Sequence, residues 1–523
     1  MSLPAAEVKD RDPSGTPPEG IEPVVLEEVN IVVSDMHISE GLEKNEKYRP
    51  SRLRRFWNWW VGLFSSVERH PVINPKNPLE DFPDDGKFVS FIDRVLETYG
   101  RASVVRLRLN GDTFDPLAVT WNGKFADPPY EHAAAGKMGR IIAGHPRFFD
   151  ALARFIRQPN CFVDLFVGNH DLFMVWERVQ RKILRRLAGE DADLAKKIRF
   201  VDQRMDFRDV HREVLYIHGH DAEANNTIDP KSVVLTHRFG RTIKNPILNA
   251  PYGSFMTVGL VNKIKQHNPL VGRLTNYKAL WRNAALHKWG WALYAALATI
   301  GNYLSNAFFD IWDVRRKTQL RLHLRVILQT MEDQPVDIYA KRLLKEYAGK
   351  IKAVILGHSH EHRRITGPEG TYINTGTWAL LFDLRWRKFE EHEFRWKRFR
   401  QLETVWLTTK HLFKTGELRF ATYVTRVLGW IAFVLALVVF LLVSFPKEGL
   451  SIWSYQISDF KVPAFILLVF VLVSGLVRFL SSKPEVVVTQ RLTFGLVRHY
   501  SDGGLNVELM EYLPEEQTFR ECV

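Results

Sequence analysis

The sequence predicts an α/β protein, and three observations support that prediction. Five short apolar runs of strand length recur along the chain, and each leads into a cluster of Asp, Asn or His residues. Between these runs lie stretches in which apolar residues recur at the spacing of an α-helix. The apolar fraction of 46% is ample for a sizeable core. Because α/β folds bind ligands at the ends of buried strands, we expect the polar clusters to converge at one edge of a sheet.

The predicted strands and the polar clusters behind them follow one another in a regular order. The strands are residues 30–33, 104–109, 162–167, 214–217 and 353–356. The clusters are Asp35-Met36-His37, Gly111-Asp112-Thr113-Phe114-Asp115, Gly168-Asn169-His170-Asp171, His218-Gly219-His220 and Gly357-His358-Ser359-His360. Four of the five clusters carry a glycine, which lets the backbone turn sharply and come close to a ligand.

The donor types in these clusters indicate the kind of metal. Carboxylates, one amide oxygen and imidazoles without a thiolate suit Mn, Fe, Zn, Ni or Co, and argue against a structural zinc site. The plausible donors are too many for one tetrahedral ion. They suit two divalent ions that share a bridging carboxylate and activate a water for in-line attack on phosphorus. A single histidine at a strand end is more often a surface or satisfied core residue than a ligand, so the prediction depends on the whole set.

In their order, the five clusters resemble the motifs D-x-H, G-D-x-x-D, G-N-H-D/E, H-G and G-H-x-H of the calcineurin-like metallophosphoesterase superfamily. The resemblance covers the chain from about Asn30 to Thr377. It implies a four-layer αββα sandwich and a metal-dependent hydrolase of phosphoric esters.

The resemblance also implies a role for each site residue. One metal would be held by Asp35, His37 and His360, the other by Asn169, His218 and His358, with Asp112 bridging both. His170 would be the catalytic histidine, which stabilises the transition state or protonates the leaving oxygen. Asp115 and Asp171 would orient their neighbours, although Asp115 can equally cap a turn. His220 stands where relatives often have Asp, and its role is left open.

The segments between the clusters add helices and one further strand. Apolar spacing predicts helices at residues 88–99 and 338–347, and residues 371–374 read as a strand. The interval between His218 and His358 holds a mostly helical insert at about 254–349. Residues 485–488 have a strand-like pattern, and the sequence leaves open whether the tail docks on the catalytic domain, which is expected at residues 24–380.

Two long apolar runs predict a C-terminal transmembrane hairpin over residues 427–480. Residues 427–446 form a run of about 20 uncharged residues, long enough to span a bilayer, and residues 462–477 form a second run. The link between them carries Trp453 and Tyr455, which favour interfaces. The alternative is a buried helical hairpin in a soluble core.

Charge and cysteine content predict the location of the domains. Basic residues flank the two runs, in a basic aromatic segment at 381–426 and in a tail at 481–523, so the positive-inside rule places the catalytic domain and the tail on the cytoplasmic side. The only two cysteines, Cys161 and Cys522, imply no disulfide framework. Residues 1–23 are polar and rich in proline, and we expect them to be disordered rather than a signal peptide.

Two further segments allow more than one interpretation. Residues 289–309 are uncharged, but one crossing there would put ligands of a single metal on opposite sides of the membrane, so we expect a lid helix or an interfacial helix. Residues 52–64 combine Arg with Trp and Phe, which suits either a helix in the headgroup layer or an amphipathic helix packed on the core.

The expected function is that of a membrane-anchored phosphoesterase with two metal ions. The net charge of +13 could serve nucleic acid or an anionic membrane. The basic residues concentrate beside apolar segments, which favours membrane lipids as partners. No nucleic acid is expected. The helical insert is similar to the lid of UDP-2,3-diacylglucosamine pyrophosphatases, which suggests a lipid-linked phosphoester or pyrophosphate, although those enzymes typically have Arg where this chain has His170. The alternatives are a soluble phosphoprotein or nucleotide as substrate, or a non-catalytic membrane scaffold.

Overall fold

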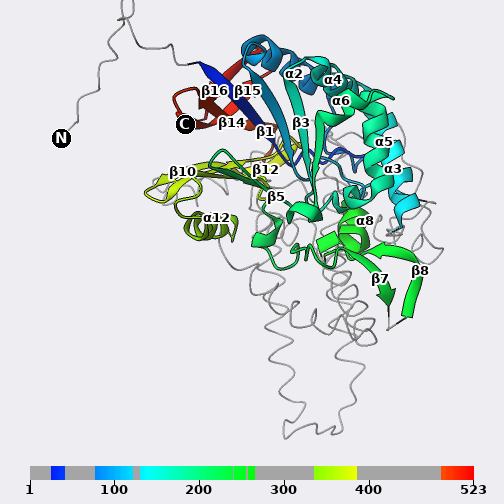
Figure 1. Ribbon diagram of the computed structural model, residues 1–523. Coiled ribbons are helices and arrows are strands. Elements are labelled where there is room, and N and C mark those ends of the chain that lie inside the picture. Colours follow the sequence, from blue (N-terminus) through cyan, green and yellow to red (C-terminus); the bar gives the residue numbers. More distant parts are fainter. Residues whose placement is uncertain are drawn as a thin grey trace, which may run out of the picture.

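Two β-sheets packed face to face form the centre of the molecule, and helices cover their outer faces (Figure 1). The structure is a computed structural model. It describes residues 25–41, 77–121, 130–238, 241–251, 253–254, 257–265, 335–385 and 485–522.

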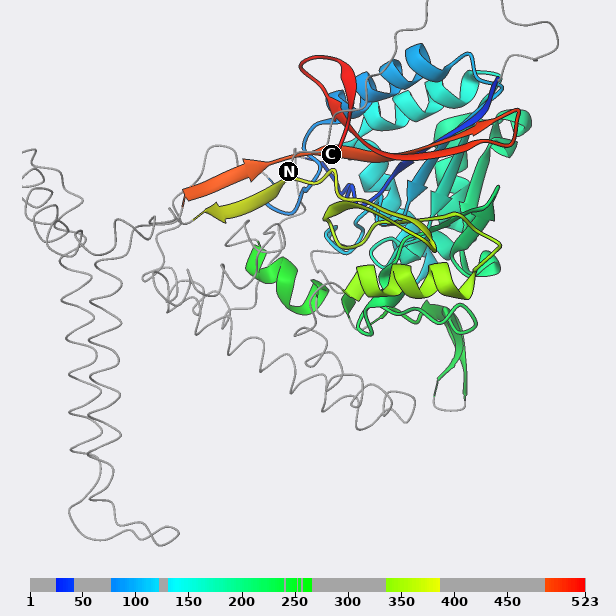
Figure 2. The ribbon, with the colours of Figure 1, turned by 90° about the vertical axis from the view of Figure 1, so that its left-hand side faces the viewer.

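The larger sheet has seven strands in the order β16-β15-β14-β1-β2-β3-β4. The bounds are β1 Leu26–Val33, β2 Val104–Asn110, β3 Cys161–Phe166, β4 Ile198–Val201, β14 Leu492–Tyr500, β15 Leu505–Leu513 and β16 Thr518–Glu521. Strands β1 to β4 are parallel, so their carboxyl ends lie at the same edge. Strand β14 pairs antiparallel with β1, and Figure 2 shows the red C-terminal strands beside the blue strand β1.

The smaller sheet has five strands in the order β10-β11-β9-β6-β5. Its strands are β5 Arg208–His211, β6 Val214–Ile217, β9 Ala353–Leu356, β10 His362–Gly367 and β11 Gly370–Thr375. Strands β6, β9 and β11 are parallel, which brings the ends of β6 and β9 to one edge. Two small antiparallel pairs complete the described strands, β7 (Val234–Arg238) with β8 (Arg241–Leu248) and β12 (Leu381–Arg385) with β13 (Glu485–Thr489).

The helices that cover the larger sheet bury one apolar face each. They are α2 (Asp85–Tyr99), α3 (Glu131–Gly144), α4 (Pro146–Arg157) and α5 (Glu177–Ala188), followed by the short α6 (Ala192–Lys196). In α2, Phe88, Phe91, Ile92 and Val95 recur at helical spacing and are buried, and Asp84 caps the helix by accepting a hydrogen bond from the backbone NH of Gly86. Helix α12 (Pro335–Glu346) covers the smaller sheet, and the short α8 is Asn262–Lys265.

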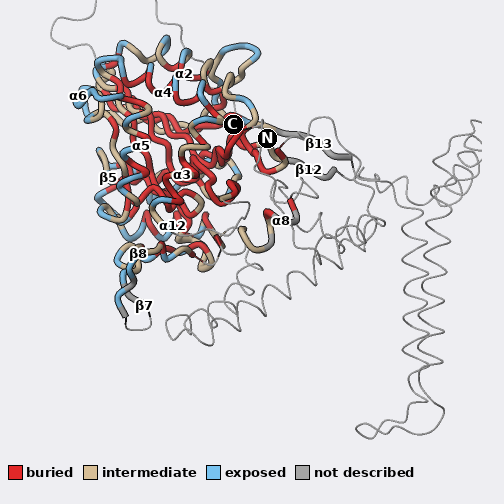
Figure 3. Tube along the Cα trace, turned by 90° about the vertical axis from the view of Figure 1, so that its right-hand side faces the viewer, coloured by how far each residue is buried: buried red, intermediate tan, exposed pale blue. Residues whose placement is uncertain are grey.

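Three apolar layers hold these elements together, and Figure 3 shows the buried residues gathered in the interior. The helices pack on the larger sheet through one extensive cluster that includes Phe91, Phe148 and Trp378. The two sheets pack on each other through a second cluster, and α12 packs on the smaller sheet through a third. Removal of this apolar surface from water is the main stabilising contribution to the fold.

A buried group of charges also joins the two sheets. Arg108 on β2 is fully buried, and its Nη1 lies 3.0 Å from Asp164 Oδ2 on β3 and 2.6 Å from Asp209 Oδ2 on β5. Its Nε donates to Asn30 Oδ1 at 2.8 Å, and its guanidinium lies 3.9 Å from the ring centroid of Tyr216 on β6. Since these partners come from both sheets, Arg108 fixes how one sheet sits on the other.

Most predicted elements within the described residues are present. The five predicted strands correspond to β1, β2, β3, β6 and β9, the strand at 371–374 to β11, and the strand-like run at 485–488 to β13. The helices expected at 88–99 and 338–347 correspond to α2 and α12. The sequence left open whether the tail docks on the catalytic domain; β14 to β16 belong to the same sheet as β1.

The predicted fold class needs one correction, which concerns the transmembrane hairpin at residues 427–480. Across the described ranges, no helix combines the length and apolar character needed to cross a bilayer. A span needs about 20 apolar residues, whereas α2 has 15 residues and buries only one face. The supported fold is a mixed α/β protein with two large sheets. The predicted localisation, a two-span anchor with a cytoplasmic catalytic domain, is corrected with it.

Several other predictions concern segments that lie outside the described residues. These segments are 427–480 itself, the N-terminal residues 1–23 that the sequence predicts to be disordered, the candidate helix at 52–64, residues 266–334 of the insert with the stretch 289–309, and residues 386–426 of the basic aromatic segment.

Candidate metal centre

The strand ends of both sheets bring three predicted ligands into one group. Asp35 and His37 follow β1, and His360 follows β9 in the other sheet. The Nε2 atoms of His37 and His360 are 3.0 Å apart, and His360 Nε2 lies 3.4 Å from Asp35 Oδ1. Residues more than 300 positions apart in sequence thus meet because the two sheets place their strand ends at the same edge.

A second group contains Asp112, His218 and His358, whose donor atoms lie within 4.8 Å of one another. The Nε2 atom of His218 is 3.3 Å from Asp112 Oδ2. The same carboxylate oxygen lies 3.9 Å from Nε2 of His37 in the first group. Asp112 therefore stands between the two groups, where a bridging carboxylate would have to be.

The backbone at these residues is strained. Asp35, His37, Asp112, His358 and His360 all have φ between 49° and 71°. They make up half of the ten non-glycine residues with positive φ in the described part of the chain. This conformation costs free energy for residues with a side chain, and it concentrates at functional sites.

Hydrogen bonds between the loops hold this strained backbone. The backbone NH of Asp35 donates to the carbonyl of Gly111 at 3.1 Å, and the backbone NH of His37 donates to the backbone carbonyl of Asp112 at 2.9 Å. Gly111 has a φ of +85°, and a Cβ there would lie 2.5 Å from the ring of His218. The glycine therefore permits both the turn and the close approach of the His218 ring.

One oxygen of each carboxylate is used by hydrogen bonds. The backbone NH of His358 donates to Asp35 Oδ2 at 2.8 Å, and the Ser34 hydroxyl donates to the same oxygen. The backbone NH of His170 donates to Asp112 Oδ1 at 2.8 Å. These bonds orient the carboxylates, so Asp35 Oδ1 and Asp112 Oδ2 are the oxygens that approach the histidine rings.

Several buried atoms at the centre have no hydrogen-bond partner among the described residues. They are Asp35 Oδ1, Asn169 Oδ1 and His218 Nε2. His218 donates from Nδ1 to the carbonyl of Asn110 at 2.9 Å, so Nε2 is the nitrogen that faces Asp112 and that, in the neutral ring, offers a lone pair. Leaving such atoms buried and unpaired is costly, and divalent cations held by the two groups would satisfy them. The buried His and Asp groups are thus able to hold a metal ion.

His170 lies at the edge of the first group. Its donor atom is within 4.8 Å of those of His37 and Asp112, and its Nδ1 lies 3.2 Å from Asp115 Oδ1. Burial by itself lowers its pKa, but the carboxylates of Asp115 and Asp112 outweigh burial and raise the pKa to about 9. His170 is therefore a candidate proton donor.

Asp171 ties two of the loops together. Its carboxylate accepts the backbone NH of Gly168 at 2.6 Å and that of Thr113 at 2.9 Å. Burial, followed by the nearby charge of Asp112, raises its pKa to about 7. Asp171 thus holds the loops that carry Asp112 and Asn169, as expected for a residue that orients its neighbours.

His220 is not brought into either group. It is fully buried, its ring centroid lies 5.7 Å from that of His218, and neither ring nitrogen has a hydrogen-bond partner among the described residues. Burial, together with the nearby His218, lowers its pKa well below the usual value, so it is a neutral histidine beneath the centre.

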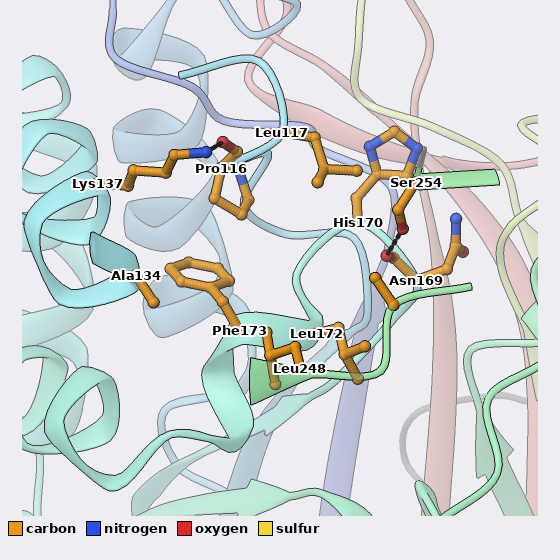
Figure 4. A pocket seen from close by; sticks show the side chains of 11 residues that line it. Pro116, Leu117, Ala134, Lys137, Asn169, His170, Leu172, Phe173, Leu248 and Ser254 are labelled. Atoms are coloured by element: carbon orange, nitrogen blue, oxygen red, sulfur yellow. Dashed lines mark hydrogen bonds between the residues drawn. The ribbon is translucent and has the colours of Figure 1, made fainter. Parts of the chain in front are cut away.

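A polar cavity of about 250 Å³ opens over the centre. Its lining combines predicted site residues with residues of the insert root and the turn after β6: Asp112, Asn169, His170, Asn225, Asn226, Gly253, Thr257, His358 and His360. Beside it, a void of about 10 Å³ lies behind Asn169 and His170 among apolar side chains such as Leu117 and Phe173 (Figure 4). The cavity has room for a phosphoryl group and part of its ester, whereas the void has room for little more than a water.

Sequence reasoning missed some of the residues at the site. Ser34 hydrogen-bonds Asp35, and Glu223 and Asn226 lie against His358. Glu223 and Asn226 fall in a polar stretch after the His218 cluster, where nothing in the residue pattern separates a site residue from an ordinary turn. Ser34 directly precedes Asp35, and only its position could have drawn attention to it.

Two comparisons of the chain with known proteins found no relative. Neither a scan against protein-family models nor a search of curated proteins finds a match to the chain. The assignment to the metallophosphoesterases therefore stays a prediction that depends on the motifs and on the geometry of the site.

Proposed function

We propose that the protein is a phosphoesterase that depends on two divalent metal ions, of Mn, Fe, Zn, Ni or Co. The observation that carries the proposal is that Asp35 Oδ1 and His218 Nε2 lie 4.0 Å apart, both buried and without a hydrogen-bond partner among the described residues, beside a cavity that Asp112 and Asn169 line. Oxygen and imidazole donors without thiolate suit these metals. The strained backbone at five predicted ligands is what a functional site is expected to carry.

The two groups of side chains suggest how the ions are shared. Asp35, His37 and His360 would hold one ion, and Asn169, His218 and His358 the other. Asp112 would bridge them, which its position between His37 and His218 supports. When bound, such ions supply activation of a water for in-line attack and neutralise charge on the phosphoryl oxygens.

The chain's own contribution to the reaction centres on His170. Its Nδ1 faces Asp115, which leaves Nε2 as the nitrogen that can give a proton. The carboxylates of Asp115 and Asp112 raise its pKa, which favours the protonated ring. His170 would donate this proton to the leaving oxygen of the ester, and Asp115 would hold the ring and stabilise its charge.

The cavity favours a polar phosphoester or a pyrophosphate as substrate. Amide, hydroxyl and imidazole groups of Asn225, Asn226, Thr257, His358 and His360 line it. These groups can hydrogen-bond the phosphoryl oxygens and the polar part of an ester.

Metal analysis combined with turnover tests the proposal. Purified protein reconstituted with Mn²⁺ is expected to bind about two ions per chain and to hydrolyse para-nitrophenyl phosphate or its diester. Asp112→Ala should lose metal and activity, whereas Asp193→Ala, which removes an exposed carboxylate on α6, should behave as wild type. Wild-type protein that binds no metal would reject the proposal. Bound metal without turnover of any ester in a panel would favour a non-catalytic scaffold.

A further inference from the structure

We infer that Glu223 is a positioning residue that orients His358 for a metal ion. This inference rests on the proposed function and names a residue that the sequence motifs do not contain. Glu223 lies just after the short helical turn His220–Ala222 that follows the His218 cluster. Its Oε2 atom is 3.2 Å from Nε2 of His358.

The chemistry of this contact fixes which nitrogen of His358 faces a metal. An ionised carboxylate only accepts hydrogen bonds, so Nε2 of His358 must be the donor and Nδ1 must carry the lone pair. Histidines that bind metals usually donate their other nitrogen to a carboxylate or a carbonyl. That bond fixes the orientation of the ring and makes the binding nitrogen more basic.

The other imidazole of the same group is held in a comparable way. His218 donates from Nδ1 to the carbonyl of Asn110 at 2.9 Å, and its Nε2 stays available. Glu223 thus does for His358 what the carbonyl of Asn110 does for His218. The rings of His218 and His358 are 5.3 Å apart between centroids and nearly perpendicular, so each needs its own support.

The carboxylate of Glu223 is itself held in place. Asn226 Nδ2 donates to the same Oε2 at 2.7 Å, and the backbone NH of Asn226 donates to the carbonyl of Glu223 at 3.0 Å, which closes a tight turn. The NH of Gly253 donates to the carbonyl of Asn225 at 2.8 Å, and a Cβ on Gly253 would collide with Asn226 Oδ1. The turn is therefore braced against the root of the insert.

His358 needs this support because its backbone is strained. Its φ is +71°, which is unfavourable for a residue with a side chain. Its backbone NH is held by Asp35 Oδ2 at 2.8 Å, from the side of the first group. Glu223 holds the ring at Nε2. The bond to the backbone NH and the bond to the ring together fix the position of His358.

Titration calorimetry with Mn²⁺ on the metal-free full chain tests the inference. Wild type is expected to show two sites. In Glu223→Ala, one site should weaken by about 10- to 100-fold and the other should not change. Glu223→Gln keeps an acceptor oxygen and should lose about threefold to tenfold at the same site. Glu369→Ala, which removes an exposed carboxylate paired with Lys345, is the matched control and should bind as wild type.

Each result decides between the possible roles of Glu223. The metal-free variants should stay folded, because Glu223 lies outside the three apolar clusters that hold the fold. Unchanged Mn²⁺ binding in Glu223→Ala overturns the inference, and so does an equal loss in the Ala and Gln variants, since that result makes Glu223 a ligand itself. If Glu223→Ala does not fold, Glu223→Gln decides alone. In that case, Mn²⁺ affinity equal to that of wild type overturns the inference. Wild type that binds no Mn²⁺ instead rejects the proposed function on which the inference rests.

Discussion

The Nδ1 atom of His170 lies 3.2 Å from Oδ1 of Asp115, although the two residues follow different strands of the larger sheet. Asp115 is buried and its backbone NH donates to the carbonyl of Ile38 at 2.8 Å, so its loop is tied to the loop after β1. The pair thus places the imidazole of His170 beside the candidate metal centre, next to a buried carboxylate.

This pairing predicts that Asp115→Asn lowers turnover without loss of metal. The variant removes the negative charge that keeps His170 protonated, and kcat should fall by about 10- to 100-fold. His170→Ala should lose roughly a hundredfold or more. Because both residues serve one proton transfer, the double variant should lose little more than His170→Ala. Kinetics with metal analysis measure this; wild-type turnover in Asp115→Asn would contradict it.

A methyl group at Gly168 should disturb the centre. A Cβ at this position would lie 2.6 Å from the backbone nitrogen of Asp112 and closer still to its Oδ1. We therefore expect Gly168→Ala to displace Asp112 and to reduce Mn²⁺ affinity and turnover by about tenfold or more. Gly367→Ala is the control, since a Cβ there meets nothing within 4 Å. Equal metal binding in the two variants would show that Asp112 has room to move.

Loss of Arg108 should destabilise the fold strongly. Arg108→Met removes the one fully buried cation that Asp164 and Asp209 share among the described residues, and removal of one partner of a buried pair costs about 3 to 5 kcal/mol. Arg199 bonds the same carboxylates but is 38% exposed. Arg199→Met should therefore cost less, about 1 kcal/mol. Urea unfolding measures both, and an equal cost would indicate that Arg108 does not hold the sheets together.

The pH dependence of stability should reflect His145. Its Nδ1 lies 2.6 Å from Asp85 and its Nε2 lies 3.2 Å from Glu80. Burial alone lowers its pKa, but the two carboxylates outweigh burial and raise the pKa to about 9. Because the folded-state pKa lies above the ordinary value of about 6.5, this stabilisation is fully present below pH 6.5 and is lost as pH rises through 9.

The comparison that isolates this effect is wild type against His145→Asn. The difference in unfolding free energy between the two should be largest near pH 6 and should shrink by up to about 3 kcal/mol near pH 10. Urea unfolding at both pH values measures it. A difference that stays constant over this range would show that His145 does not gain a proton on folding.

The candidate site residues could be picked out from the sequence because they fall in short clusters. Each cluster directly follows a strand, and parallel strands carry their ends to a common edge, so Asp35, Asp112 and Asn169 could be placed together from pattern alone. The partners of these residues were harder to find. The contact of Glu223 with His358 depends on how the turn after β6 folds back, which no periodicity encodes.

The individual strands and helices of the fold were predictable, but the pairing of distant strands was not. The strands before the clusters and the helix α2 follow from apolar periodicity. The position of β14 beside β1 does not, since pairing between strands so distant in sequence leaves no local pattern. The transmembrane interpretation of residues 427–480 used run length, apolar character and the aromatic and basic residues beside the runs, and these features do not distinguish between all the environments that an apolar segment can have.

The pairing of β14 with β1 also bears on synthesis of the protein. During translation, β1 emerges before β14 and has β2 on one side, but its other edge stays open until residues 492–500 have left the ribosome. An exposed apolar strand edge promotes association between chains. The nascent polypeptide should therefore depend on chaperones until β14 has emerged, and expression at reduced temperature should improve the yield of folded material.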